Sequence, residues 1–456
     1  MRYVSTRGQA PVLGFADVVL EGLATDGGLY VPERWPSLDV PGQGPYAELA
    51  ARVIAPFSGD DIDGATMARL CTEAYAGFRH PDVVPIVDLE EGHHLMELFH
   101  GPTLAFKDVA LQLLGRLFDH ILSARSQRVT IVGATSGDTG SAAIDGVKNC
   151  ANVDIVILYP KGRVSDVQRR QMTTIDSPNV RTVAVEGTFD DCQDLVKAMF
   201  NDAPFRRRNN LSAVNSINWA RVMAQVVYYV EATRRLGGPI DVSVPTGNFG
   251  NVLSGWIAKT MGAPIRHLVV ASNQNDILTR FFESHAMSIT GVHPTLSPSM
   301  DIQVSSNFER LLFEMNARDG AVTAEQLARF RERGTLAVEP DQYAAWIEPT
   351  FRASRASDHD TLATIRSVHE TTGVLLDPHT AVGVKAAREH REDGVPMLTL
   401  ATAHPAKFPD AVERATGVRP ALPDHLANLF DLPEKTVTLP ADLAVIERFV
   451  ENPTAG

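Results

Sequence analysis

The stretch Glu97-Leu-Phe-His-Gly-Pro-Thr-Leu-Ala-Phe-Lys107-Asp-Val-Ala110 places a lysine where a turn runs into a helix. Gly101-Pro102 is typical of a turn. The apolar residues that follow have the spacing of a helix, at Leu111, Leu114, Phe118 and Ile121. Thr103 is a candidate N-cap. Lys107 is therefore expected in or near the first turn of the helix.

This is an unusual place for a lysine, because the helix dipole puts partial positive charge at the helix N-terminus. Apolar neighbours such as Phe106 would also bury the amine. Burial and nearby positive charge both lower the pKa of a lysine, and a neutral lysine is a nucleophile or forms Schiff bases. The alternative is a surface lysine whose stem covers Phe106.

Composition and charge limit the possible functions. The chain has 456 residues, 44% of them hydrophobic, which is enough for two or three domains. Its formal net charge of -13 argues against nucleic acid or an anionic membrane as a partner. The three cysteines form no CxxC motif and indicate a reducing compartment. Without an apolar run of membrane-spanning length or a secretory signal, we expect a cytoplasmic protein.

Strand, turn and helix signals alternate through most of the chain. The predicted strands are 129–132, 153–158, 180–185, 240–244, 265–270 and 397–401. Amphipathic helical stretches separate them, for example from Trp219 to Thr233. Such alternation is typical of an α/β protein with mostly parallel sheets. Ligands of such folds bind at the carboxyl ends of strands, so the turns after these strands are candidate sites.

The pattern also suggests a division into domains. We predict a mainly helical N-terminal domain (1–82), a catalytic core (83–430) and a C-terminal extension (431–456). Within the core we expect a smaller α/β subdomain at about 100–205 and a larger one at about 206–430, with an insertion at about 272–376. In the insertion, Thr323-Ala-Glu-Gln326 fits a capping box that opens a helix.

Two glycine-rich turns follow predicted strands. They are Val132-Gly-Ala-Thr-Ser-Gly-Asp-Thr-Gly-Ser-Ala-Ala143 and Val242-Ser-Val-Pro-Thr-Gly-Asn-Phe-Gly-Asn251. Backbone N–H groups at the start of a helix bind anions, although such glycines can also serve only a tight turn. The first spacing fits neither the dinucleotide fingerprint nor a P-loop. Two such turns and a lysine suggest a phosphorylated aldehyde cofactor held as a Schiff base, with a substrate that carries a carboxylate.

A third turn follows the last predicted strand, in Thr399-Leu-Ala-Thr-Ala-His-Pro-Ala-Lys-Phe408. Thr402 would end the strand, and His404 before a proline is expected to be structural. No cluster of His, Cys, Asp and Glu has metal-ligand spacing. Basic side chains that could bind a second phosphate, or could be ordinary surface charges, are Lys161, Arg163 and Arg221.

Taken together, these motifs resemble the threonine synthases, which are fold-type-II pyridoxal-phosphate enzymes related to the tryptophan synthase β subunit. The resemblance spans most of the chain. Besides the stretches above, it includes motifs at 25–32, 215–221, 297–302, 305–310 and 377–381. The motif Ser305-Ser-Asn-Phe-Glu-Arg310 is among the most specific. Because the chain opens directly on the N-terminal unit, it resembles the bacterial and fungal branch.

The resemblance implies roles for individual residues. Lys107 would bind pyridoxal 5'-phosphate as a Schiff base and move protons. Thr402 would contact the pyridine nitrogen. The cofactor phosphate would be bound by Gly247, Asn248, Phe249, Gly250 and Asn251. The substrate carboxylate would be bound by Thr135, Ser136, Gly137, Asp138 and Thr139. For the substrate phosphate the candidates are Lys161, Arg163 and Arg221.

The resemblance further implies conversion of O-phospho-L-homoserine and water to L-threonine and phosphate by a monomer or homodimer. One alternative is a lyase of the same fold that releases 2-oxobutyrate from the same substrate. A serine or threonine dehydratase would not need the candidate phosphate-binding residues Lys161 and Arg163. A catalytically silent amino-acid-binding homologue would not need Lys107.

Overall fold

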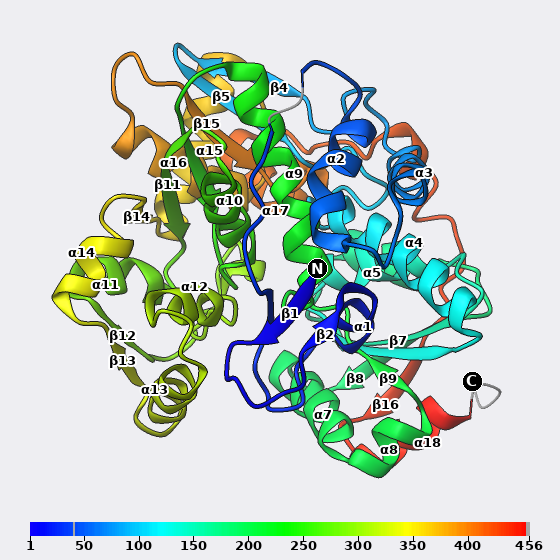
Figure 1. Cartoon of the computed structure of the whole chain (residues 1–456). Helices are drawn as coiled ribbons and strands as arrows, with labels where there is room; N and C mark the ends of the chain where they lie inside the picture. The colour runs from blue at the N-terminus through cyan, green and yellow to red at the C-terminus, as the bar shows by residue number, and fades with distance from the viewer. Residues whose placement is uncertain (40–41, 453–456) are drawn as a thin grey trace.

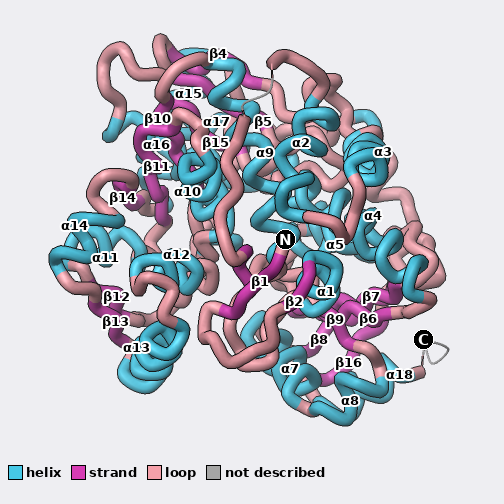
Figure 2. The backbone as a smooth tube through the Cα atoms, viewed as in Figure 1, coloured by secondary structure: helices cyan, strands magenta, loops and turns pink. Residues whose placement is uncertain are grey.

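The computed structural model describes residues 1–39 and 42–452 and has an α/β architecture, as predicted (Figure 1). Every strand predicted from the sequence is present. These strands are β6 (Val129–Ala134), β7 (Val153–Pro160), β8 (Val180–Glu186), β10 (Ile240–Pro245), β11 (Ile265–Ser272) and β15 (Met397–Ala401). Strands and helices alternate along most of the chain, as the tube in Figure 2 shows.

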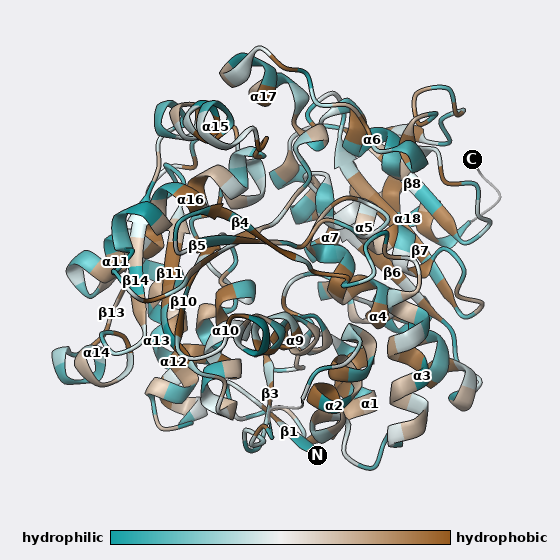
Figure 3. Ribbon diagram, turned by 90° about the horizontal axis from the view of Figure 1, so that it is seen from above, coloured by the Kyte–Doolittle hydropathy of each residue, from teal (hydrophilic) through white to brown (hydrophobic). Residues whose placement is uncertain are grey.

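The larger sheet has six strands in the order β14-β11-β10-β15-β5-β4. The strands that the sequence did not predict are β4 (Ile86–Glu90), β5 (His93–Glu97) and β14 (Phe351–Arg355). Only the β4–β5 pair is antiparallel. Helices α9 (Trp219–Leu236) and α10 (Gly250–Met261) lie on one face of the sheet, and α15 (Asp358–Thr372) and α16 (Pro378–His390) lie on the other (Figure 3). The sheet is therefore buried on both faces, as parallel sheets require.

The smaller sheet has five parallel strands in the order β16-β8-β7-β6-β9. Its short edge strands are β9 (Leu211–Ser212) and β16 (Val437–Pro440). Its helices are α5 (Asp138–Val147), α6 (Asp166–Thr173), α7 (Phe189–Asn201), α8 (Ala203–Arg208) and α18 (Leu443–Glu451). The segment expected as a C-terminal extension, described as far as Asn452, thus adds a strand and a helix to this sheet.

The N-terminal unit contains α1 (Phe15–Glu21), α2 (Tyr46–Ser58) and α3 (Gly64–Tyr75). It also has an antiparallel sheet that the sequence did not predict, with the order β2-β1-β3. Its strands β1 (Arg2–Ser5), β2 (Leu13–Gly14) and β3 (Tyr30–Pro32) are too short to show periodicity. This unit packs against α9, where the Trp219 indole N–H donates to Tyr3 Oη at 3.1 Å.

The insertion contains short elements. They are α11 (Ile277–Ser284), β12 (Ala286–Ser288), the 3-10 helix η1 (Pro298–Met300), α12 (Phe308–Met315), α13 (Gly320–Arg333), β13 (Thr335–Ala337) and α14 (Pro340–Trp346). The predicted capping box at Thr323 was wrong. Helix α13 begins at Gly320, because the Asp319 carboxylate accepts the N–H groups of Ala321 and Val322.

Helix α4 (Lys107–Arg125) is buried along most of its length beside α5. A Cβ atom on Gly115 would lie only 2.0 Å from the carbonyl oxygen of Gly146, so glycine is needed where the two helices meet. The predicted N-cap at Thr103 was wrong, because Phe106 precedes the first helical residue, Lys107. The remaining elements are η2 (Pro405–Lys407), α17 (Pro409–Thr416) and η3 (Asp424–Leu426). Among the described residues, no helix is both long and apolar enough to cross a membrane.

Candidate active site

Lys107 is the first residue of α4, and its side chain is buried. Its Nζ donates to Asp138 Oδ2 at 3.3 Å and to Ser299 Oγ at 3.3 Å. The turn before it is held by Asp108, whose side-chain oxygens accept the Thr103 N–H at 2.8 Å and the Thr103 hydroxyl at 2.6 Å. Leu104 in this turn has φ +64°. Several contacts within ten residues therefore fix the position of the Lys107 backbone.

Asp138, the first residue of α5, lies between two buried ammonium groups. Besides Lys107, its carboxylate accepts from Lys407 Nζ at 2.8 Å and from Gln168 Nε2 at 2.9 Å. Burial alone would raise the pKa of Asp138, but Lys107 and Lys407 hold it well below its usual range. Asp138 is therefore a carboxylate at neutral pH.

The electrostatic surroundings favour a neutral Lys107 amine. Burial lowers the pKa of Lys107, and the charges of Lys407 and Arg221 lower it further, whereas Asp138 opposes them. Even with Lys107 neutral, two cationic side chains, Lys407 and Arg221, act on this amine against the single carboxylate of Asp138, so positive charge is in surplus. Such a surplus fits an anionic ligand.

The second glycine turn connects β10 to α10, as predicted. Phe249 precedes the helix with φ +62°, and the backbone N–H groups at the start of α10 are potential anion donors. The carbonyl oxygen of Ser299 would lie 2.8 Å from a Cβ atom on Gly247. Ser299 Oγ also accepts from Lys107 Nζ, so Ser299 lies next to both the glycine turn and the lysine.

Thr402 follows β15 and is tied to the Lys107 segment. Its carbonyl oxygen accepts the Phe106 N–H at 2.8 Å, and the His404 N–H donates to the Leu104 carbonyl at 3.0 Å. The Thr402 N–H donates to Thr380 Oγ1 at 3.2 Å. These contacts hold Thr402 against Phe106, the residue before Lys107. The two predicted cofactor-binding residues, Lys107 and Thr402, therefore have fixed positions relative to each other.

The first glycine turn connects β6 to α5, as predicted. The Thr135 hydroxyl accepts the N–H groups of Gly137 at 3.0 Å and Gly140 at 2.8 Å. Ser136 and Thr139 are only half-buried. A Cβ atom on Gly137 would overlap the Gln168 amide. The Asp138 carboxylate is paired with Lys107 and Lys407 and cannot donate to an anion. In this turn, the groups that could donate to an anion are therefore backbone N–H groups and hydroxyl groups.

The three basic residues predicted for the substrate phosphate lie in different surroundings. Arg221 is buried, and its charge acts on Lys107. Lys161 and Arg163 lie on an exposed turn after β7, where Lys161 pairs with Glu186 at 3.2 Å. The structure therefore brings Arg221 toward Lys107 but leaves the other two at the surface.

The chemistry of this region fits pyridoxal phosphate. Among the described residues, two buried donors of the predicted site, Arg221 Nε and Asn251 Nδ2, have no hydrogen-bond partner. The Asn251 side-chain oxygen already accepts from Tyr228 and Tyr229, which leaves its Nδ2 group for another acceptor. Buried donors without partners are costly. The cofactor phosphate would supply an acceptor near Asn251, and a substrate phosphate would supply one for Arg221.

Sequence reasoning missed several side chains around Lys107. Ser299 and Lys407 contact the Lys107–Asp138 pair directly, and Gln168 contacts Asp138. The ring of His379 accepts the Ser299 N–H at 3.3 Å and holds Asp377 at 2.8 Å. Ser299, His379 and Lys407 all belong to the quoted motifs, so the signal was present, but the spacing alone could not assign their partners.

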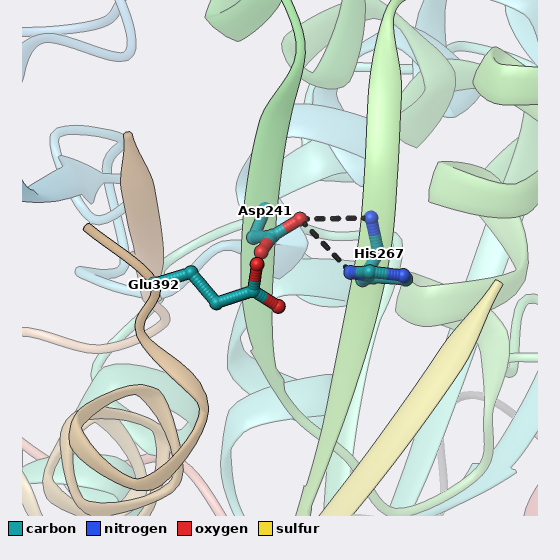
Figure 4. A group of neighbouring side chains, drawn as sticks. All are labelled: Asp241, His267 and Glu392. Carbon is teal, nitrogen blue, oxygen red and sulfur yellow. Dashed lines mark hydrogen bonds and ion pairs between the residues drawn. The ribbon is translucent and has the colours of Figure 1, made fainter. Parts of the chain in front are cut away.

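Another polar cluster, of Asp241, His267 and Glu392, lies at the start of β10 and β11 (Figure 4). Arg266 donates to Asp241 Oδ1 at 2.9 Å and to Glu392 at 2.6 Å. Arg352 donates to His267 Nε2 at 3.0 Å. The carboxylates are thus neutralised by arginine. Asp241 is at the opposite end of β10 from Gly247, so this network is separate from the candidate active site.

Three family models match the chain. "Threonine synthase N terminus" matches residues 2–75, "Pyridoxal-phosphate dependent enzyme" matches residues 89–345, and "Threonine synthase, C-terminal" matches residues 380–450. Similar proteins include the threonine synthase of Pseudomonas aeruginosa, 54% identical over 99% of this chain and 98% of that protein. The threonine synthase of Saccharomyces cerevisiae is 38% identical over 99% of this chain and 98% of its own length.

Solved structures of threonine synthases are also similar to this chain over its whole length. Pyridoxal-phosphate-bound threonine synthase from Brucella melitensis is 50% identical, with a TM-score of 0.96 over all of both chains. Yeast threonine synthase has a TM-score of 0.93 and 38% identity, covering 100% of this chain and 99% of its own. A tomato threonine deaminase, 12% identical with a TM-score of 0.52 over 88% of this chain and 93% of its own, shares the fold alone.

Proposed function

Since this chain belongs to the threonine synthase family, we propose that it converts O-phospho-L-homoserine and water to L-threonine and phosphate. It is a pyridoxal-phosphate-dependent lyase of fold type II, so the predicted fold class and cofactor are confirmed. The observation that most supports this specific reaction is the full-length similarity to threonine synthases, and the buried Lys107 amine, which faces Asp138 between the N-termini of α4 and α5, supports the cofactor.

The proposed cofactor site uses residues from three turns. Lys107 Nζ is the covalent attachment point. The backbone N–H groups of Gly247–Asn251 would hold the phosphate, and Thr402, whose carbonyl accepts from Phe106, would supply a hydroxyl to the pyridine nitrogen. When bound, pyridoxal phosphate takes up the electrons released when a proton leaves the substrate.

Lys107 is the proposed proton carrier. With its Nζ free, Lys107 would remove the proton on the substrate Cα atom. At the end of the reaction, Nζ would return a proton to Cα. Asp138 and Ser299 hold Nζ near this position between the two transfers.

The proposed substrate site faces this amine. Thr135, Ser136, Gly137, Asp138 and Thr139 line the turn for the carboxylate, with backbone N–H and hydroxyl groups as donors. Arg221 is the proposed principal contact of the substrate phosphate, because it is buried near Lys107 with an unpartnered Nε. Lys161 and Arg163 would join it if the exposed turn that carries them closes over the substrate.

A product balance tests the proposal. The purified holoenzyme is given O-phospho-L-homoserine, and phosphate, threonine and 2-oxobutyrate are measured together. Phosphate matched by threonine supports threonine synthase activity. Phosphate matched by 2-oxobutyrate would instead assign a phospholyase with the same cofactor and lysine. A Lys107→Ala variant is the control and should lose product formation by about a thousandfold or more.

We also propose that the chain works in the cytoplasm as a monomer or homodimer. Support for a reducing compartment comes from Cys71, Cys150 and Cys192, which are buried free thiols. Sedimentation of the holoenzyme would give the oligomeric state, and cell fractionation would test the compartment.

The domain boundaries at 82, 205 and 430 remain a proposal. The two sheets support a division of the core into a smaller and a larger subdomain. Limited proteolysis should cut near these boundaries. A stable fragment that joins 100–205 to the segment around β16 would extend the smaller subdomain to the end of the described chain.

A further inference from the structure

Arg310 in α12 is a buried cation, and no carboxylate among the described residues contacts it. It is 1% exposed. Its Nε donates to the Tyr30 carbonyl at 3.0 Å, its Nη2 donates to the Ile217 carbonyl at 2.7 Å, and its Nη1 donates to Asn307 Oδ1. The guanidinium lies 5.8 Å from the centre of the Trp219 ring. All its hydrogen-bond acceptors are therefore neutral.

The nearest acidic neighbour along the helix, Glu309, is already neutralised. Its carboxylate accepts from Arg7 Nε at 3.1 Å and from Arg7 Nη2 at 3.0 Å, and it also accepts the Thr6 hydroxyl at 2.6 Å. Burial lowers the pKa of Arg310 to about 9, so the group is still charged at neutral pH. Glu309 opposes the effect of burial only in part, so the guanidinium has no paired counter-charge, which is costly. This raises the question of which anion Arg310 serves.

A single residue, Asn307, connects Arg310 to the second glycine turn. The Asn307 side chain accepts from Arg310, and the Asn307 N–H donates to the Asn248 carbonyl at 3.1 Å. A Cβ atom on Gly250 would lie 3.2 Å from Asn307 Nδ2. Ser305 Oγ, in the same motif, donates to the Gly247 carbonyl at 2.7 Å. Asn307 thus fills the space between the guanidinium and the turn.

We propose that Arg310 is a positioning residue for the cofactor phosphate: its buried charge lies behind the Gly247–Gly250 turn, orients this turn through Asn307 and favours a dianion bound there. This inference rests on the proposed placement of the phosphate. The contacts to Tyr30 and Ile217 hold the guanidinium in place, so its field on the turn is preorganised.

The test compares two cofactors that differ only in the phosphate. Pyridoxal 5'-phosphate and pyridoxal are titrated against the apoenzyme, and attachment to Lys107 is followed by absorbance. In Arg310→Met, the affinity for pyridoxal phosphate should fall about tenfold or more, since one buried charge is lost behind a dianion. The affinity for pyridoxal should be unchanged. A purely structural role would weaken both ligands equally and would overturn the inference.

Arg318→Met is the matched control, because Arg318 also holds the N-terminal unit, through the carbonyl of Pro32 at 2.5 Å, but does not contact Asn307. It should leave the ratio of the two affinities at the wild-type value. A ratio that falls as far as in Arg310→Met would mean that docking of the N-terminal unit, and not the Arg310 charge, controls phosphate binding.

Asn307→Asp keeps the experiment decisive if Arg310→Met does not fold. It preserves the acceptor for Arg310 and places a negative charge between the guanidinium and the turn. The ratio of pyridoxal phosphate to pyridoxal affinity should fall here too, and an unchanged ratio overturns the inference. If the wild type itself does not prefer pyridoxal phosphate, the proposed phosphate site fails. If the wild type does prefer it but neither variant changes the ratio, only the role of Arg310 fails.

Discussion

Lys407 Nζ lies 2.8 Å from Asp138 Oδ1, on the same carboxylate whose other oxygen accepts from Lys107. Lys407 has no exposed surface and also donates to the Thr103 carbonyl at 2.8 Å. It would therefore remain a partner for Asp138 when Lys107 takes part in the proposed reaction. Its charge also favours release of a proton from Lys107.

Replacing Lys407 by methionine should therefore make Lys107 harder to deprotonate. Without the second ammonium, Asp138 stabilises the protonated amine of Lys107 alone, so its pKa rises. The midpoint pH for attachment of pyridoxal phosphate, followed by absorbance, should move up by about one pH unit. Lys435→Met removes an exposed lysine that pairs with Asp176 and should leave the midpoint unchanged. Equal midpoints in wild type and Lys407→Met would contradict this role.

Arg221 should be the main determinant of affinity for the substrate phosphate. Arg221→Met is expected to raise KM for O-phospho-L-homoserine about tenfold or more, the usual cost of a lost charge-assisted contact. Steady-state kinetics with saturating cofactor would measure it. Lys161→Ala and Arg163→Ala should raise KM only if the exposed turn closes. An unchanged KM in both would remove these two residues from the phosphate site.

Thr402 should limit side reactions. A hydroxyl next to the pyridine nitrogen leaves that nitrogen mostly neutral, whereas a carboxylate would keep it protonated. Thr402→Asp should therefore increase transamination, measured as pyridoxamine phosphate formed per threonine. Thr402→Ser keeps the hydroxyl and serves as the control. No rise in pyridoxamine phosphate in the aspartate variant would argue against the contact.

Asp108 should make the stability of the protein depend on pH. Burial raises the pKa of Asp108 from its usual 3.8 to about 7, so the folded state holds a proton that the unfolded state releases. The free energy of unfolding that depends on Asp108 is therefore highest below about pH 4, and it falls as the pH rises from about 4 to 7. The Asp108→Asn variant cannot ionise at this position. Compared with this variant, the wild type should lose up to about 4 kcal/mol of its free energy of unfolding by pH ~8.

Urea unfolding of both proteins at about pH 4.5 and pH 8 would measure this difference. The variant serves as the control because it keeps every ionisable group except Asp108, so its pH dependence is that of all the other groups. Asparagine can still accept the Thr103 N–H, so the turn before Lys107 should persist. Parallel stability curves for the two proteins would show that Asp108 is ionised in the folded state.

Local patterns predicted the parts of the site that depend on neighbouring residues. Lys107 does lie in the first turn of its helix, and both glycine turns do lie between a strand and a helix. Thr103 was assigned wrongly because Leu104, with φ +64°, does not have a helical backbone, and α4 begins only at Lys107. The spacing of apolar residues does not reveal such a turn.

Contacts between distant segments could not be predicted from one sequence. Ser299 is 192 residues from Lys107, and Lys407 is 304 residues from Thr103. Strands β4 and β5 and the edge strand β16 were missed for a similar reason, since their pairing depends on the sheets that they join. The resemblance indicated which motifs matter, but only the fold shows which side chains touch.

The position of β16 has a consequence for biosynthesis. Its partner strand β8 is translated about 250 residues earlier, and four strands of the larger sheet, β10, β11, β14 and β15, are made in between. Until Val437 has left the ribosome, β8 remains an unpaired edge, which is a template for aggregation. We therefore expect a nascent chain that stops at Leu432 to depend on chaperones, and co-sedimentation of such stalled chains with and without added chaperone would reveal this dependence.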